Sequence, residues 1–451
     1  MAAALNRTFL SLGVPNYRRY FAGQVVSLSG NWMQIVAEMW LVVQLTGSGV
    51  AVGITAALQF LPILLFAAMG GVLADRMDKR RLLMLTQALM VLPALALWGL
   101  TVGVAVEIWM VYALVFVRGT VNALDNPARQ SFVSELVGAS RTVNAVALNA
   151  VLVHSARIVG PAIAGGVIAF AGVGPCFLIN ALSFGAMLVA LYGMDTARLH
   201  TPRPAPRARG ELRSALRYVA ATPALRIPLA MMALVGLLSF NFLILLPLLA
   251  EFTWQGTATT YALLTTAMGV GSVGGALLAG ARGHVTSRLL VGAAAAFGLL
   301  LLLAAAAPTL PLQVAALVPL GAVSVTFAAG INSALQVAVD PAMRGRVMAL
   351  FSVVFLGSTP IGAPLVGWLA EVAGPRAGLV VGAVAALAAA AGARVAFARA
   401  GDADRAYAPA TEPPLPAPAA HESRRHAAAA ARRRRGEHAD AHRAPARDPG
   451  E

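Results

Sequence analysis

The chain has 451 residues, of which 59% are hydrophobic and only 12% are charged, with a formal net charge of +15 at pH 7. Soluble globular proteins have about twice that fraction of charged residues, so lipid is the expected solvent for most of this chain. The basic residues lie between apolar runs and in the tail, which argues against a nucleic-acid-binding domain. The single cysteine, Cys176, excludes an intrachain disulfide and argues against a cysteine-based metal site.

Twelve apolar stretches are long enough to cross a bilayer, since a spanning helix needs about 20 mostly apolar residues. A spanning β-strand has about half that length and alternates in polarity, so we predict an all-α membrane protein with twelve transmembrane helices. The expected spans are 20–45, 50–74, 82–104, 107–127, 142–171, 175–195, 224–250, 258–281, 285–307, 311–338, 346–372 and 377–400.

Basic residues are concentrated at the N-terminus and in the loops that follow the even-numbered spans. The alternate loops have none, apart from Arg376. Because basic segments stay on the cytoplasmic side, both termini are expected there, in a multi-pass protein of the inner or plasma membrane.

The longest loop between spans, 196–223, is rich in proline and arginine and separates six spans from six. We therefore predict an N-terminal bundle over 1–195, a cytoplasmic linker over 196–223 and a C-terminal bundle over 224–400. The stretch "LRSALRYV" in the linker is amphipathic, which leaves two interpretations open: a helix on the membrane surface or a solvated linker. The tail, 401–451, is low-complexity and expected to be disordered, and contact of its arginine run with anionic lipid is one possibility.

The two halves resemble each other. The segment "GPAIAGGVIAFAG" near the end of span five has a counterpart, "GAPLVGWLAEVAG", in span eleven, and "NALDNPARQ" is echoed by "NSALQVAVDPAMRGR". An offset of six spans preserves orientation, so the repeat is parallel about an axis along the membrane normal. Two pseudo-symmetric six-helix bundles around a central cavity are the expected architecture.

The segment "GGVLADRMDKRRLL", 70–83, carries six charges in the seven residues from Asp75 to Arg81. Basic residues alone would fix the topology, so the two aspartates need another explanation. Small side chains at Gly70, Gly71 and Ala74 are expected to let spans two and three approach each other.

This loop resembles the signature of the major facilitator superfamily of secondary transporters, G-x-x-x-D-R-x-G-R-R/K, and the resemblance covers residues 1–400. Asp78 stands where the superfamily commonly has glycine. The matching positions are Gly71, Asp75, Arg76, Lys79 and Arg80.

Span five contains "GPAIAGG", which resembles the G-P-x-x-x-G-G element of exporters in the drug:proton antiporter branches, through Gly160, Pro161, Gly165 and Gly166. The segment "NALDNPARQSFVSELV" resembles the branch that includes enterobactin-type siderophore exporters and macrolide efflux proteins. Close helix packing is the alternative explanation of the glycines, beside a role in sealing the outer half of the cavity.

The resemblance implies alternating-access export of small amphiphilic compounds such as siderophores, macrolides or other drug-like metabolites. The partners would be that substrate, protons and the lipid bilayer, and the energy source would be a proton gradient without a cofactor. The charged loop is then expected to latch the cytoplasmic gate, with Asp75 pairing with Arg344 or Arg346 of the opposite half. The alternative is a loop that only sets topology.

Few ionisable groups are expected inside the membrane, and Glu38 is the only carboxylate placed well within a span. Asn31 and Gln34 lie on related turns of the same helix, and Arg118 or Arg157 is the expected partner of Glu38. A buried carboxylate with a raised pKa would suit a proton carrier, whereas the alternative is a static buried salt bridge. His154 is a weaker candidate carrier. Two arginines against one glutamate favour an acidic substrate.

Two other functions remain open: a facilitator or importer of a small polar metabolite, and a receptor or scaffold that transports nothing. An enzyme is not expected, because no nucleophile arrangement, metal cluster or nucleotide loop is evident. The glycine-rich "GVGSVGG" lies inside a predicted span, where it serves packing.

Overall fold

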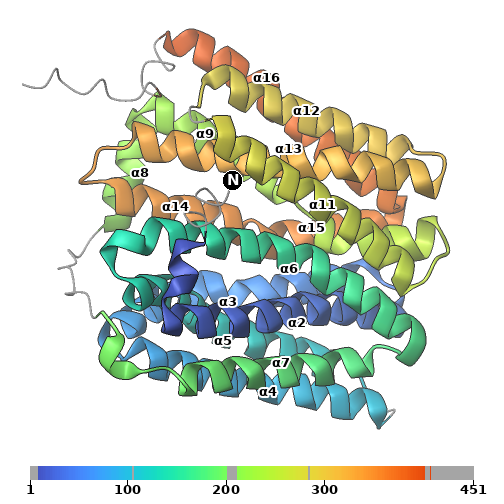
Figure 1. Cartoon of the computed structure of the whole chain (residues 1–451). Helices are drawn as coiled ribbons and strands as arrows, with labels where there is room; N and C mark the ends of the chain where they lie inside the picture. The colour runs from blue at the N-terminus through green and yellow to red at the C-terminus, as the bar shows by residue number, and fades with distance from the viewer. Residues whose placement is uncertain (1–8, 104–105, 201–210, 283–284, 402–406, 408–451) are drawn as a thin grey trace, which may run out of the picture. The chain divides into compact units, whose positions relative to one another are not determined.

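The computed structural model describes residues 9–103, 106–200, 211–282, 285–401 and 407, and every regular element in those ranges is helical (Figure 1). The predicted tail, 401–451, lies almost wholly outside them, so its disorder and its lipid contact stay predictions. The elements of the first half are η1 (Leu10–Gly13), α2 (Pro15–Thr46), α3 (Gly49–Arg76), α4 (Lys79–Val102), α5 (Ile108–Val137), η2 (Ala139–Arg141), α6 (Thr142–Ala171) and α7 (Gly174–Tyr192).

The second half is built in the same way, with more interruptions. Its elements are η3 (Thr196–Arg198), α8 (Glu211–Ala221), α9 (Pro223–Leu238), α10 (Phe242–Leu248), η4 (Leu249–Thr253), α11 (Ala258–Arg282), α12 (Ser287–Ala306), α13 (Leu310–Ala338), α14 (Arg344–Gly357), α15 (Thr359–Ala373) and α16 (Pro375–Ala400).

The all-α membrane fold is confirmed. Eleven helical segments of the described chain are long and apolar enough to cross a membrane. Helix α2, with 32 residues, supplies the twelfth by length, but polar side chains lower its hydropathy. Those side chains are buried, so α2 is a spanning helix whose polar groups face protein instead of lipid.

Three predicted spans differ from the observed helices. Helix α5 continues to Val137, ten residues beyond the predicted end, and Pro127 lies inside it. Pro127 has no N–H and cannot donate a hydrogen bond to the Ala123 carbonyl. Helix α3 approaches that carbonyl at Gly70, where a side chain would collide with the oxygen. The predicted approach of Gly70 to span three is therefore wrong: its contact is with α5.

The other two differences are breaks in helices that the sequence predicts as continuous. Span seven is interrupted between α9 and α10, where Asn241 Nδ2 donates to the Leu237 carbonyl at 2.9 Å, and it ends in the π-helical turn η4. Span eleven is interrupted at Ser358, whose hydroxyl donates to the Phe355 carbonyl at 2.9 Å. Side chains thus satisfy carbonyls that continuous helices would have bonded internally.

The six helices α2 to α7 pack mainly on one another, as do α9 to α16; they fill the lower and upper parts of Figure 1 respectively. Two helix pairs make the most extensive contacts between the halves: α3 with α15, and α6 with α11. Smaller contacts join α14 to α3, and α10 to α2 and α3. The linker helix α8 buries Ala215 and Val219 and packs on α9 and α14. Its Tyr218 hydroxyl donates to Asp340 Oδ2 at 2.9 Å, so α8 is attached to the second half.

Glycines allow the closest of these contacts. Gly49 of α3 and Gly367 of α15 face each other so closely that a side chain on either would collide with the other's carbonyl. Within the second half, Gly271 of α11 and Gly321 of α13 meet backbone of the opposite helix in the same way. Backbone-to-backbone contact of this kind is how helices associate where lipid leaves no hydrophobic driving force.

Candidate functional site

A buried ion pair joins α2 and α5. Arg118 Nη2 donates to Glu38 Oε2 at 2.6 Å, and the two residues are 4% and 0% exposed. The partner of Glu38 is therefore Arg118, and not Arg157. Both charges are removed from solvent, so each depends on the other and on nearby polar groups for stabilisation.

Amide side chains complete this network. Gln34 lies one turn before Glu38 on α2, and its Nε2 donates to Glu38 Oε1 at 2.7 Å, while Asn180 of α7 donates to Gln34. Arg118 also donates to Asn31 Oδ1 at 3.3 Å and to Gln59 Oε1 at 3.2 Å. The polar face predicted on α2 is therefore real, because side chains three and four residues apart share one side of a helix.

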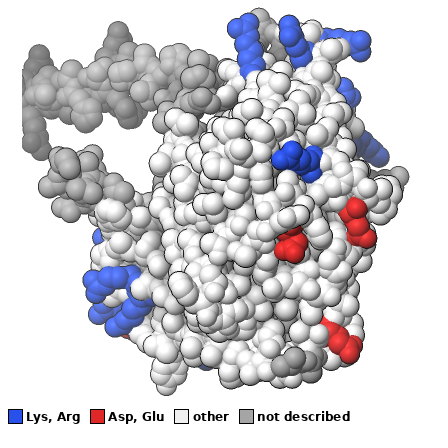
Figure 2. Space-filling model, turned by 90° about the vertical axis from the view of Figure 1, so that its right-hand side faces the viewer, with Lys and Arg blue, Asp and Glu red and all other residues white. Residues whose placement is uncertain are grey.

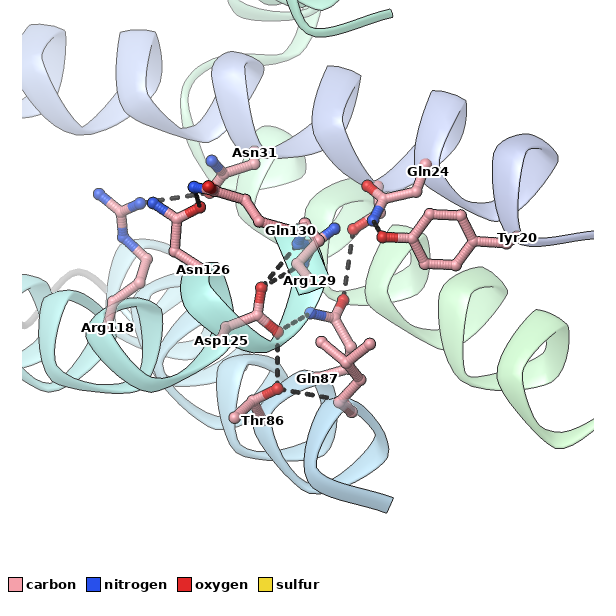
Figure 3. Close-up of polar contacts among 12 residues, drawn as sticks. Tyr20, Gln24, Asn31, Thr86, Gln87, Arg118, Asp125, Asn126, Arg129 and Gln130 are labelled. Atoms are coloured by element: carbon pink, nitrogen blue, oxygen red, sulfur yellow. Dashed lines mark hydrogen bonds and ion pairs between the residues drawn. The ribbon is translucent and has the colours of Figure 1, made fainter. Parts of the chain in front are cut away.

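A second ion pair, with a buried carboxylate, lies further along α5. Arg129 Nε donates to Asp125 Oδ2 at 2.7 Å, and Thr86 Oγ1 and Gln87 Nε2 of α4 donate to Asp125 Oδ1 at 2.6 and 3.0 Å (Figure 3). Asp125 is 1% exposed and lies within a candidate span. The expectation that Glu38 is the only carboxylate well inside a span is therefore wrong.

The sequence did contain a signal for this pair. Asp125 and Arg129 are four residues apart, the spacing at which opposite charges meet on a helix. Pro127 between them led to the prediction that the span ended there, so Arg129 was assigned to a loop.

A polar cavity of about 490 Å³ lies between the two ion pairs within the first half. Arg118 and Arg129 both line it, and Figure 3 shows Asn31, Asn126 and Gln130 between them. The cavity is large enough for several water molecules and has the polar partners that water needs. Its lining residues are Ser27, Leu28, Asn31, Met90, Arg118, Asn122, Asn126, Arg129, Gln130, Val146, Asn149, Ala150, Val153 and Phe184.

A second cavity, of about 300 Å³, is lined by both halves and is the central cavity of the fold. On one side stand Trp32 of α2 and Arg157 of α6, whose guanidinium carbon lies 5.0 Å from the centre of the Trp32 ring. On the other side Phe240, in the break of span seven, contacts Phe355 in an edge-to-face arrangement. The broken helices therefore contribute to the cavity wall, as is common for binding sites in transporters.

His154 lies on α6, one turn before Arg157, and is partly buried. Its Nδ1 has no hydrogen-bond partner in the described part of the chain. Within that part, no group of three or more metal-ligating side chains is found.

The charged loop contacts its own half through its basic residues. Lys79 pairs with Glu135 at the end of α5, and Arg80 Nε donates to the Leu191 carbonyl of α7 at 2.7 Å. Asp78 caps α4 by accepting a hydrogen bond from the Arg81 amide at 2.8 Å, which explains an aspartate where the superfamily has glycine. Gly71, Asp75 and Arg76 form the last turns of α3, where Asp75 and Arg76 are exposed.

The span-five residues lie at two different contacts. A Cβ on Gly160 would lie 2.5 Å from Trp32 Cβ, so this glycine brings α6 against α2, next to Pro161 inside the helix. A Cβ on Gly165 would lie 2.5 Å from Ala262 Cβ of α11, so this position is at the junction of the halves. Gly166 has open space around its Cα and makes no such contact.

An additional junction between the halves was not predicted from the sequence. Glu371, at the end of α15, accepts hydrogen bonds from Ser48 Oγ at 2.6 Å and from the Val50 amide at 3.1 Å. The carboxylate therefore caps the N-terminus of α3, where the helix dipole favours a negative charge. Figure 2 views the bundle from the side on the right of Figure 1, which is largely uncharged with a few scattered acidic and basic side chains.

A family model described as "Transmembrane secretion effector" matches residues 8–425. The staphyloferrin A transporter of Staphylococcus aureus (strain NCTC 8325 / PS 47) is 25% identical over 257 residues, 56% of this chain and 64% of that protein. The chain thus spans less than two thirds of that relative's length, and 49% of the length of another curated relative.

Two further relatives align over more of their length. Multidrug efflux pump Tap of Mycolicibacterium fortuitum is 28% identical, over 77% of this chain and 88% of that protein. Macrolide efflux protein A of Streptococcus pyogenes is 23% identical, over 76% of this chain and 86% of that protein.

Among solved structures, the nucleoside transporter NupG has the same fold, with a TM-score of 0.68 and 11% sequence identity over 85% of this chain and 99% of that chain. At that identity the likeness concerns the fold alone. The predicted resemblance is confirmed: the chain belongs to the transmembrane secretion effector family of the major facilitator superfamily.

Proposed function

We propose that this protein is a proton-coupled exporter of small amphiphilic compounds, working by alternating access in the plasma membrane with both termini in the cytoplasm. Its family consists of transporters and not of enzymes. The relatives named above for staphyloferrin A, multidrug and macrolide transport support export of a siderophore or drug-like metabolite. The observation that carries the proposal is the buried Glu38–Arg118 pair.

The pair has the properties of a proton-binding site. Protonation of Glu38 would remove the charge that holds Arg118, and Arg118 would keep Asn31 and Gln59 as hydrogen-bond acceptors. The arginine can therefore remain buried while the carboxyl is neutral, which makes protonation less costly than in an isolated pair. The polar cavity that reaches Arg118 provides a route for protons through water, and no cofactor is needed.

Helix geometry supports a cytoplasmic gate between Asp75 and Arg346. Gly357 of α14 packs on Leu64 of α3, where a Cβ on the glycine would lie 3.0 Å from Leu64 Cδ1. Asp75 and Arg346 each lie eleven residues from that contact, toward the end with the charged loop. At a rise of about 1.5 Å per residue both are about 16 Å away, so they stand at the same depth on facing helices. Flux should fall in Asp75→Arg or Arg346→Asp alone and recover when the two charges are exchanged together.

The decisive experiment measures proton movement in liposomes containing purified protein and a pH-sensitive dye. The compounds offered would be an acidic siderophore, a macrolide and a cationic dye. The wild type is compared with Glu38→Gln and with the matched control Glu107→Gln. Glu107 is outside the network and contacts Trp109 at the start of α5.

We expect compound-dependent proton movement in the wild type and in Glu107→Gln, and none in Glu38→Gln. Compound flux without proton movement, or coupled flux that survives Glu38→Gln, would contradict the proposal. Absence of flux for every compound, with binding retained, would favour a receptor or scaffold instead.

A further inference from the structure

We infer that the central cavity selects organic anions with an apolar, aromatic body, and that Arg157 binds their acidic group. This inference deepens the proposed function, because it takes the central cavity to be the substrate site. It assigns a substrate class and a specificity-determining residue.

Arg157 is the only charged residue among the described residues that line the central cavity. Two other arginines of this half, Arg118 and Arg129, each have a carboxylate partner within 2.6 Å. No carboxylate among the described residues pairs with Arg157, which stacks on Trp32 instead. Its side chain is accessible from the open space of the cavity.

The stacking leaves Arg157 able to bind a ligand. A guanidinium over an indole ring is attracted to the face of the ring, while its N–H donors lie in its own plane. Those donors suit the two oxygens of a carboxylate or a similar acidic group. The ring therefore holds the cation in place and the N–H groups stay available.

Backbone contacts on two sides fix the position of this arginine. Gly160 brings α6 onto Trp32, and Gly269 of α11 lies against the Arg157 carbonyl, where a Cβ would be 3.1 Å from the oxygen. Arg157 thus stands where α6 meets both α2 and the opposite half. A cation at this position faces the cavity that both halves line.

The remainder of the cavity defines the rest of the ligand. Aromatic side chains from both halves line it, with a few hydroxyl groups from Thr265, Ser272 and Ser324. A volume of about 300 Å³ is at the lower end of the range for small-molecule sites. A flat apolar body with one acidic group matches this combination, whereas a cationic compound would meet the Arg157 charge without a compensating carboxylate.

The test uses three probes with the same ring and different charge: 1-naphthaleneacetate, its neutral isostere 1-naphthaleneacetamide, and 2-(1-naphthyl)ethylamine. Binding to the purified full chain in detergent is measured by equilibrium dialysis. The wild type should bind the acid about tenfold more tightly than the amide, as expected for a hydrogen bond to a charged group, and the amine most weakly.

Arg157→Gln should abolish the difference between acid and amide, and Arg157→Lys should retain a preference for the acid. Arg376→Gln is the matched control, because Arg376 also stacks on a tryptophan, with its guanidinium carbon 5.5 Å from the Trp254 ring centre, but does not line the cavity. This control should bind like the wild type.

The inference is overturned if the wild type binds the amide or amine as tightly as the acid, if it binds none of the three, or if the preference survives Arg157→Gln. Dialysis needs no proton gradient, so the result is independent of the proposed function. Binding of the acid through Arg157 without proton-coupled flux would contradict the function alone. Proton-coupled flux of a cationic compound, with no preference for the acid, would contradict this inference alone.

Discussion

The two halves share an architecture but differ in where they place ionisable groups. In the first half the buried set includes Glu38, Arg118 and Asp125, all in hydrogen-bonded ion pairs. In the second half the buried polar side chains that the structure describes are all neutral: Ser239, Asn241, Ser272, Gln313, Ser324 and Ser358. One half therefore buries charged side chains, whereas the described part of the other buries only neutral polar ones.

The repeated Asp-Pro-Arg motif shows how this difference arises. In the first half, α5 continues through Pro127, so Asp125 and Arg129 are enclosed among helices. In the second half, α13 ends at Ala338 before the motif, and Asp340 is exposed and bonded to Tyr218 of the linker helix. The same residue types thus become an internal ion pair in one half and a surface contact in the other.

The largest effect is expected from breaking the Glu38–Arg118 pair. Arg118→Leu leaves a fully buried carboxylate without its partner, which should cost about 3 to 5 kcal/mol of stability. Thermal melting in detergent measures the loss, and the double variant with Glu38→Leu should recover most of it. The counterpart in the second half is Gln313→Leu, which loses two neutral hydrogen bonds, one donated to the Ala304 carbonyl and one accepted from the Trp254 indole, and should cost about 1 to 3 kcal/mol. Equal losses would show that the halves do not differ as described.

The repeated motif provides the next comparison. Asp125→Asn removes the counter-charge of Arg129 and should destabilise by about 2 to 3 kcal/mol, because hydrogen bonds to charged groups are the stronger ones. Asp340→Asn changes an exposed residue and should stay within about 0.5 kcal/mol. The same melting experiment compares the two. A larger loss for Asp340→Asn would contradict the assignment of the internal pair to the first half.

Two adjacent glycines test the junction of the halves. Gly165→Ala places a Cβ 2.5 Å from Ala262 and should cost about 1 to 3 kcal/mol through overpacking between α6 and α11. Gly166→Ala points into open space and should be neutral or stabilise the helix by up to about 1 kcal/mol. Melting temperature and transport rate are measured for both variants. Similar behaviour of the two would mean that the junction is not as tight as described.

The smallest effect is expected at Glu371. Because this carboxylate is solvent-exposed, Glu371→Gln should weaken its contact with Ser48 and the α3 N-terminus by at most about 1 kcal/mol. That corresponds to about a fivefold change in the ratio of closed to open molecules at this end. Spin labels at Leu45→Cys and Val372→Cys, both exposed, report the separation of the halves at this end. The native Cys176 is fully buried and should not be labelled. An unchanged distance distribution would remove Glu371 from any role in closing that end.

Most of the fold was predictable because membrane insertion makes sequence signals unusually direct. Apolar length predicted the helices, which the structure contains. The division into six spans and six was predicted from the long loop 196–223 and the repeat. The breaks at 239–241 and Ser358 were not predictable, because uniformly apolar segments carry no periodicity that marks an interruption. The extension of α5 was missed because a proline normally ends a helix, whereas here Gly70 of another helix lies against the Ala123 carbonyl, for which Pro127 has no N–H to donate.

The sequence predicted which residues form the site, but not which of them contact one another. Glu38, Arg118 and the amides stood out as polar residues in apolar spans. Which arginine meets Glu38 depends on the rotation of α5 and α6 about their axes, which a uniformly apolar sequence does not specify. The Glu371 contact joins residues more than 300 positions apart, so only the assembled fold reveals it.

The backbone contacts between α11 and α13 have a mechanical consequence. Where glycines bring two helices together without intervening side chains, no side chain between them can change rotamer to let one helix shift against the other. We therefore expect α11 and α13 to move as one rigid unit within the second half. Bending of the second half is then expected at 239–241 and at Ser358, the two places where the helices beside the central cavity are already interrupted.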